Sequence, residues 1–280
     1  AGKKEKSDRR KRLLETDCLD AKDDVFKRPP LVELVREAPL ENIKLVLKHK
    51  VDINAADEFG GTALYEAVRA GRKDVVELLL KHGADANAKD KHGATVLRYT
   101  LSASKPDYDC AELLLQAGAD INVPDKSGET LLGQALTNDN LPMAEFLLKH
   151  KASPDVTDKF KTPLLQMAMK KKGTQILELL LKYGANPNVE GTLGKPLLQS
   201  ALEDGKLDVA EILLKHGADA NAKDKGGSPI INGLLLSKEA IILLLRNGAD
   251  LGATNKSGDN VLKCNKYNPR FTEALESIVK

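Results

Sequence analysis

One short signal returns along the chain at a nearly constant interval, and this limits the available folds more than any other feature. Gly-Ala-Asp, or a near copy, begins at residues 50, 83, 118, 151, 184, 217 and 248. The successive intervals are 33, 35, 33, 33, 33 and 31 residues. A period of this length is typical of stacked identical supersecondary units. We therefore expect function on an extended surface rather than at one deep catalytic pocket.

Residues 57–89 show how one repeat unit is expected to fold. Turn-forming residues lead to Thr62, whose hydroxyl is suited to cap a helix by accepting a backbone N–H bond. The pattern over 63–70 predicts a short helix with Leu, Ala and Val on one face. The pattern over 74–82 predicts a second helix that is apolar around much of its circumference, as expected for a helix packed between neighbours. Gly83 is expected to end it in a left-handed cap.

Such short helices depend on their neighbours for stability. Neither helix of a unit exceeds about three turns, and isolated helices of that length are marginal in water. Apolar residues make up 41% of the chain but aromatic residues only 4%, and there is no Trp. The core is therefore expected to consist of Leu, Val, Ile and Ala shared between stacked units.

The motif Asp-x-x-Gly-x-Thr-x-Leu-x-x-Ala, followed by Val-Val-x-Leu-Leu-Leu and Gly-Ala-Asp-x-Asn, resembles the ankyrin repeat. The resemblance recurs in register seven or eight times over about nine-tenths of the chain. It implies an all-α solenoid of helix-turn-helix units with short β-hairpin fingers, which binds a protein or peptide through the fingers and the concave face of the inner helices. It implies repeats at 24–56, 57–89, 90–124, 125–157, 158–190, 191–223 and 224–254 and a capping repeat at 255–280. The preceding residues 1–23 are expected to form a basic, partly disordered segment.

The repeats depart from the family pattern in three places. No repeat has His after the conserved Leu, where Tyr65, Arg98, Gly133, Gln166, Gln199 and Asn232 stand instead. The family's hydrogen bond from that His must be replaced or absent, which leaves the rigidity of the fingers open. The 90–124 repeat carries two extra residues between its helices, and the 224–254 repeat lacks two at the same joint.

One eleven-residue segment occurs twice without change, at 81–91 and 215–225. Natural repeats that drift apart seldom stay so alike. One hypothesis is therefore that the chain is partly consensus-engineered, and an engineered scaffold without a natural partner is one alternative function.

Residue types that often carry chemistry have structural explanations here. Histidines recur at the end of the second helices, at 49, 82, 150 and 216, where a cation-capable side chain interacts favourably with the helix dipole. Asparagines recur after the Gly-Ala-Asp signal, and we expect them to bond their own backbone in the turn; hydroxylation is the alternative that the resemblance offers. Cys110 lies on an apolar helix face and is expected to be a core residue. We expect no enzyme, cofactor, metal or small-molecule substrate.

The ends of the chain differ in charge. Residues 1–12 hold seven Lys and Arg against two acidic residues, so this segment has a net charge of +5. Because the net charge of the whole chain is +2, the remaining residues have a net charge of −3. Residues 1–12 are either a solvated tail or a patch for nuclear import or nucleic acid, which makes a nuclear or nucleic-acid-associated adaptor the second candidate function. Residues 13–23 are either an extra helix or an intramolecular ligand of the groove. Three distant cysteines favour a reducing compartment, so we expect the chain in the cytoplasm, with the nucleus as the alternative. We also expect a monomer.

No apolar run of the length that a membrane helix needs is found, so no membrane partner is expected.

Candidate partner-binding residues fall in two sets. At the fingertips, large apolar groups stand where solvated ones are expected, and they either anchor a partner or tuck under the next finger. The fingertip candidates are Phe59, His92, Phe160 and Leu193. The candidates on the concave side of the inner helices are Glu66, Arg69, Tyr99, Gln134, Asn138, Met167, Lys170, Lys171, Glu203 and Asp204.

Two charged groups on the expected concave side are of opposite sign. Lys170, Lys171 and Lys172 form a basic group, and Glu203, Asp204 and Asp208 form an acidic group in the next repeat. They either neutralise each other across the repeat boundary or set the direction and register of a bound peptide.

Overall fold

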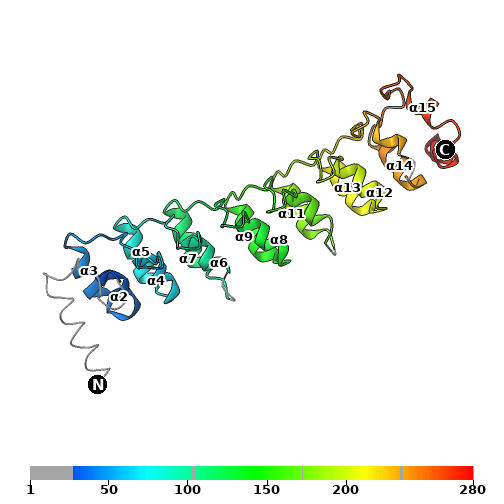
Figure 1. Cartoon of the computed structure of the whole chain (residues 1–280). Coiled ribbons are helices and arrows are strands. Elements are labelled where there is room, and N and C mark those ends of the chain that lie inside the picture. Colours follow the sequence, from blue (N-terminus) through cyan, green and yellow to red (C-terminus); the bar gives the residue numbers. More distant parts are fainter. Residues whose placement is uncertain (1–27, 103–104, 172, 234–235, 280) are drawn as a thin grey trace. The chain divides into compact units, whose positions relative to one another are not determined.

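The computed structural model describes residues 28–102, 105–171, 173–233 and 236–279. These residues form an all-α ankyrin-repeat solenoid of helix pairs and hairpins, which confirms the predicted fold class (Figure 1). The basic segment at 1–12, the proposed helix or ligand at 13–23, and Lys172 lie outside the described residues. The chain divides into two compact parts, residues 1–131 and 132–280, and each is described separately.

In the first part, each repeat contributes an inner and an outer helix. The inner helices are α2 (Pro30–Glu37), α4 (Ala63–Arg69) and α6 (Val96–Ser102); the outer helices are α3 (Leu40–Leu47), α5 (Lys73–Lys81) and α7 (Tyr108–Gln116). α4 packs against α2, α5 and α6, and α5 packs against α3 and α7. Inner helices therefore stack on inner helices and outer helices on outer helices.

The second part repeats this arrangement up to its last two repeats. Its helices, apart from α8 (Leu131–Thr137), which spans the division, are α9 (Leu141–Lys149), α10 (Leu164–Ala168), α11 (Gln175–Lys182), α12 (Leu197–Glu203), α13 (Leu207–Lys215), α14 (Lys238–Arg246), α15 (Val261–Cys264) and α16 (Pro269–Val279). α11 packs against α9 and α10, α13 against α12 and α14, and α14 against α16.

The 224–254 repeat has no inner α-helix in the described residues. Its chain forms only one 3₁₀ turn, η2 (Ile230–Asn232), and Gly233 then leaves the turn in an extended conformation. The sequence placed the two missing residues at the joint between the helices. Their loss instead accompanies a change of the inner helix itself, because Pro229 and Gly233 leave too short a segment for a full helical turn to propagate.

The predicted caps are confirmed in the 57–89 repeat. The Thr62 hydroxyl accepts a hydrogen bond from the Tyr65 N–H at 3.3 Å. Gly83, at φ 87°, ends the outer helix in the left-handed region that an L side chain rarely adopts. The apolar face is also as predicted, since Leu64 and Ala67 are at most 1% exposed.

The asparagines after the Gly-Ala-Asp signal do not have the role expected from the sequence. The Asn54 side chain accepts from the Asp85 N–H at 2.8 Å and donates to the Gly83 carbonyl, so it bonds the next repeat rather than its own turn. Asn87, Asn188 and Asn221 make the same pair of bonds. The turn itself is held by the residue two positions earlier, as when Asp52 accepts from the Asn54 N–H. These asparagines therefore connect consecutive repeats.

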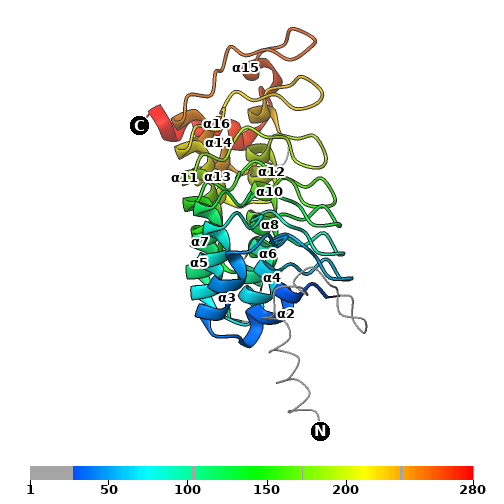
Figure 2. The same ribbon diagram turned by 90° about the vertical axis from the view of Figure 1, so that its left-hand side faces the viewer.

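The hairpin fingers are closed by isolated antiparallel bridges. These bridges pair Lys89 with Thr95, Thr157 with Pro163, Glu190 with Pro196, Lys223 with Pro229 and Thr254 with Asn260. In each compact part the fingers project to one side of the helix pairs (Figure 2). Within the described residues, no helix is both long and apolar enough to cross a membrane.

The last helix differs from expectation at its end. Phe271 is buried as predicted, and Leu275 is half-buried, but Ile278 is 40% exposed rather than inward-facing. α16 packs on α14. Ala274, fully buried, supplies the inward position between Phe271 and Leu275.

Candidate binding surface

The fingers are held by a carboxylate that binds its own turn. In the 57–89 repeat, Asp57 Oδ1 accepts the N–H groups of Phe59 and Gly61 at 2.9 and 2.8 Å, and Gly60 takes φ 80°. Asp90, Asp125 and Asp158 act in the same way in their fingers. The third residue of each of these fingers is exposed.

The large apolar fingertip residues are exposed rather than tucked away. Phe59 is 56% exposed, and Phe160 and Leu193 are each 73% exposed. The ammonium groups of Lys91 and Lys159 lie 5.2 Å from the ring centroids of Phe59 and Phe160. His92 is likewise exposed. Of the two alternatives from the sequence, the structure supports the one in which these groups are available to a partner.

The finger that carries Leu193 has Gly191 in place of the turn aspartate. Gln166 of the preceding repeat binds this finger at a different N–H group, because its Oε1 accepts the Thr192 N–H at 3.0 Å, whereas the turn aspartates accept the N–H groups two and four residues after them. Its Nε2 also donates to the Thr192 hydroxyl at 3.3 Å. A Cβ at position 191 would lie 3.2 Å from the Gln166 side chain and from Leu197, so the glycine makes room for this substitute.

Residues in the position after the conserved Leu replace the family's His in several ways. Arg98 pairs with Asp125 at 3.6 Å and donates to the Glu129 carbonyl, both in the next finger. Gln166 holds the next finger through Thr192. Tyr65 packs against Tyr99 with ring centroids 5.0 Å apart. The question left open by the sequence therefore has an answer for two fingers, which are held by Arg98 and Gln166 of the preceding repeats.

Glu66 is buried in the inner surface of the first part. It is 4% exposed, and its carboxylate lies 3.5 Å from Arg36 Nε and 3.7 Å from Arg69 Nε. Both arginines are exposed. Glu66 thus offers a partner little surface of its own, and it orients two guanidinium groups that do face solvent.

The predicted basic and acidic groups each have closer partners. Lys171 Nζ lies 2.9 Å from Asp139 and 3.2 Å from the Thr137 carbonyl, both in the preceding repeat. Glu203 pairs with Lys195 of its own repeat at 2.8 Å. Lys171 and Glu203 are therefore each paired outside the two predicted groups rather than with one another. Lys170 and Asp204 are exposed.

The remaining predicted concave-side residues occupy the inner helices or their ends. Tyr99 on α6, Gln134 on α8 and Met167 on α10 are half-buried, whereas Asn138, just after α8, is exposed. Tyr99 belongs to the first compact part and the other three residues belong to the second.

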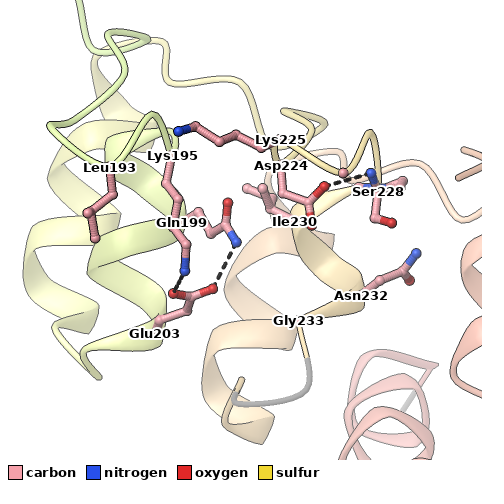
Figure 3. A pocket seen from close by; sticks show the side chains of 12 residues that line it. Leu193, Lys195, Gln199, Glu203, Asp224, Lys225, Ser228, Ile230, Asn232 and Gly233 are labelled. Carbon is pink, nitrogen blue, oxygen red and sulfur yellow. Dashed lines mark hydrogen bonds and ion pairs between the residues drawn. The ribbon is translucent and has the colours of Figure 1, made fainter. Parts of the chain in front are cut away.

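Sequence reasoning missed a cleft in the second part. It has a volume of about 530 Å³ and lies between the 191–196 finger, α12 and the 224–233 segment (Figure 3). Leu193 and Glu203 were predicted, but Lys195, Gln199, Asp224 and Asn232 were not assigned to a site. The available signal was the two-residue deletion in the 224–254 repeat, whose described residues form the 3₁₀ turn η2 where other repeats have an inner helix.

Two buried polar atoms of the cleft have no hydrogen-bond partner. They are Gln199 Oε1, an acceptor, and Asn232 Nδ2, a donor. Leaving a buried polar atom unpaired costs about 1–3 kcal/mol. Native structures therefore seldom retain such atoms without a reason.

The other candidates for chemistry have structural roles. His82 and His216 each place Nδ1 within hydrogen-bond distance of the carbonyl four residues earlier, at 2.8 and 2.9 Å, in the last turn of an outer helix. Cys110 is buried, and this burial together with its hydrogen bond to Asp107 raises the pKa of its thiol to about 12. Among the described residues, no group of His, Cys, Asp and Glu is placed to hold a metal ion.

The family model described as "Ankyrin repeats (3 copies)" matches the sequence over four partly overlapping ranges, residues 3–90, 99–191, 132–224 and 164–255. The chain therefore belongs to the ankyrin repeat family. Folds of this family serve in general as interaction scaffolds rather than enzymes. No curated protein matches the sequence.

Solved structures agree with this assignment. The ankyrin repeat domain of Bcl-3, a member of the IkappaB protein family, is 25% identical and superposes with a TM-score of 0.58, covering 78% of this chain and 98% of that one. An ankyrin repeat domain from Acinetobacter baumannii AYE is 30% identical with a TM-score of 0.55, covering 68% of this chain and 98% of that one.

Proposed function

We propose that this chain binds a protein or peptide through its fingertips and the concave side of its inner helices, and that it catalyses no reaction. The observation that carries the proposal is the exposure of Phe160 and Leu193, each 73%, on fingers that are held in place by hydrogen bonds at their bases. A rigid apolar group loses little conformational entropy when a partner covers it, which favours its use as an anchor.

The polar candidates support the same surface. Arg36 and Arg69 flank Glu66 in the first part, and Lys170 and Asp204 are exposed in the second. Such charges contribute more to association rate and register than to affinity. A monomer located in the cytoplasm or nucleus fits the unpaired thiols of Cys110 and Cys264, and fluorescence microscopy of the tagged chain tests that location.

The test is a selection of dodecapeptides from a displayed library on the immobilised full chain. We expect enriched peptides to lose at least tenfold in affinity for a variant with Phe160→Ser and Leu193→Ser. Tyr267→Ser is the matched control, because Tyr267 is 87% exposed but lies between α15 and α16 rather than on a finger. Equal loss in the control, or no loss in the fingertip variant, would refute the proposal.

A further inference from the structure

In the second compact part, the outermost positions of the fingers carry positive charge and no negative charge. Each finger begins with its turn position, and the next three residues form its tip. In the fingers that begin at residues 158, 191, 224 and 255, every charged residue of a tip is a lysine. These lysines are Lys159, Lys161, Lys225 and Lys256, and all four are exposed. None of them forms an ion pair with another described residue.

The aspartates of these fingers belong to the turns rather than to the tips. Asp158 is half-buried, and its Oδ1 accepts the N–H groups of Phe160 and Thr162, both at 2.8 Å. Asp224 is also half-buried, and its Oδ1 accepts the Ser228 N–H at 2.8 Å. Backbone N–H groups that bind a carboxylate offset part of its charge. A partner that approaches the tips from solvent therefore meets ammonium groups first.

Each of the two exposed apolar groups of this part has a lysine beside it. Lys159 Nζ lies 5.2 Å from the centroid of the Phe160 ring. Lys225 extends from its own finger toward the 191–196 finger, which carries Leu193 (Figure 3). A Cβ built at Gly194, next to Leu193, would lie 2.6 Å from Lys225 Nζ. An apolar contact and an ion pair can therefore form side by side at both fingertips.

One exposed carboxylate lies near this surface. Glu190 Oε2 is 3.4 Å from the position of the same Cβ, so it is near Lys225, but the two side chains form no ion pair. Glu190 comes before the turn of its finger, and it moderates the charge of Lys225 without affecting the pairing of Lys159 with a ligand. The tips of the four fingers therefore keep an excess of positive charge.

The spacing of the two apolar groups fits an extended chain. Phe160 and Leu193 occupy the third position of consecutive fingers. Packed helices lie about 8–10 Å apart, so the fingers of consecutive repeats have a similar separation. An extended polypeptide rises about 3.3 Å per residue. Two residues about three positions apart in such a chain therefore reach both groups.

The tips match an acidic peptide better than a nucleic acid. Ammonium groups attract carboxylates and phosphates alike, but the two ligands differ in what else they need. Single-stranded nucleic acid stacks successive bases on aromatic side chains, and Phe160 is the one aromatic residue among these four tips. Leu193 packs instead against an aliphatic side chain. The net charge of the whole chain, +2, also gives little general attraction to nucleic acid.

We propose that these fingertips bind an extended, acidic segment of the partner. Two aliphatic residues of the segment, about three positions apart, pack on Phe160 and Leu193, and carboxylates next to them pair with Lys159 and Lys225. The apolar contacts supply most of the affinity, whereas the ion pairs speed association and fix the direction of the segment. This inference rests on the proposed function and names the chemistry of the partner.

A double variant of the full chain, Lys159→Gln with Lys225→Gln, tests the charge of the tips against the selected peptides. One exposed ion pair changes an affinity about two- to fivefold, so we expect binding about four- to twenty-five-fold weaker. The loss should arise mainly from slower association and should shrink in high salt. Lys149→Gln with Lys182→Gln is the matched control. It removes the same charge at the exposed ends of α9 and α11, and Lys182 Nζ also lies near an aromatic ring, 5.8 Å from the centroid of Tyr183.

The peptides provide the complementary test. We expect them to contain more Asp and Glu than Lys and Arg, with two aliphatic residues about three positions apart. Replacing the acidic residues beside these by Asn or Gln should weaken binding to the original chain about as much as the lysine variant does. The neutral peptide should then bind the original chain and the lysine variant equally. A lysine that only stabilised its finger would instead lower the affinity of both peptides.

The outcomes separate the two proposals. If the peptides depend on Phe160 and Leu193 but bind the lysine variant as tightly as the control variant, only this inference is overturned. Selection of neutral or basic peptides has the same meaning. If no peptide is selected, or the peptides ignore Phe160 and Leu193, both proposals are overturned. An oligothymidylate that binds the original chain more tightly than every selected peptide, and the lysine variant more weakly, would also overturn this inference, because nucleic acid would then be the ligand of the tips.

Discussion

Replacing Asn188 by Ala tests whether the recurrent asparagines hold consecutive repeats together. In the structure its Nδ2 donates to the Gly217 carbonyl at 3.0 Å and its Oδ1 accepts the Asp219 N–H at 2.8 Å. The variant loses both bonds. An ordinary hydrogen bond contributes about 0.5–1.5 kcal/mol net to the free energy of unfolding. Because these groups are exposed and water can replace the partner, we expect the lower range, about 1–2 kcal/mol in total.

The measurement is equilibrium unfolding in urea, followed by circular dichroism at 222 nm. We expect a lower midpoint with an unchanged dependence on urea concentration, since the folded surface is the same. Asn186→Asp is the matched control, because the Asn186 oxygen accepts the Asn188 N–H within the turn and a carboxylate can do the same. A loss below about 0.3 kcal/mol for Asn188→Ala, comparable with the control, would refute the inter-repeat role.

Three further predictions concern a buried thiol, an acid-sensitive turn and a substituted finger. The pKa of the Cys110 thiol is about 12 in the folded chain against an ordinary 9.0, so at pH 8 this thiol should react with a thiol reagent about a thousandfold more slowly than the same thiol in the chain unfolded by urea. Mass spectrometry of the labelled peptide measures both rates, and equal rates would contradict the burial of Cys110. Burial alone would raise the pKa of Asp125, but hydrogen bonds from the Ser127 hydroxyl and N–H and from the Glu129 N–H, together with the nearby Arg98 charge, lower it. The Asp125 carboxylate therefore contributes fully to the free energy of unfolding above its ordinary pKa of 3.8, and this contribution is lost as the pH falls through the lower pKa of the folded state. Unfolding at pH 6 and pH 3 should accordingly show a smaller acid loss for Asp125→Asn than for the original chain, and an identical loss would exclude this role. Gln166→Ala should speed hydrogen exchange in the 191–196 finger, and adding Gly191→Asp should restore protection by supplying the turn carboxylate of the other fingers; no change in the single variant would contradict the role of Gln166 in holding this finger.

The sequence was sufficient for features that one repeat determines alone. The period, the Thr62 cap, the left-handed glycine at 83 and the burial of Cys110 depend on local chemistry and on an apolar pattern. The candidate fingertip residues follow from the same register. Exposure of Phe160 could be weighed but not decided, because tucking depends on how the next finger lies.

Features that depend on the stacking geometry were not predicted. The asparagines were expected to bond their own turn, because sequence shows no partner 29 or 31 residues away, as Gly217 and Asp219 are for Asn188. Ile278 continues the helical pattern of α16 but is 40% exposed, because its burial depends on what packs against the end of the helix and not on the pattern alone. The cleft borders the 224–233 segment, whose described residues form a 3₁₀ turn in place of an inner helix, and a two-residue deletion does not reveal which element changes.

Hydrogen exchange of the full chain with a selected peptide tests the central claim most directly. We expect binding to slow exchange at the 158–163 and 191–196 fingers and in the 224–233 segment, with little change in α11 and α13, whose outer positions lie away from the fingers. Protection confined to those outer helices, or binding without protection at any finger, would contradict the proposal that the fingers and inner side form the working surface.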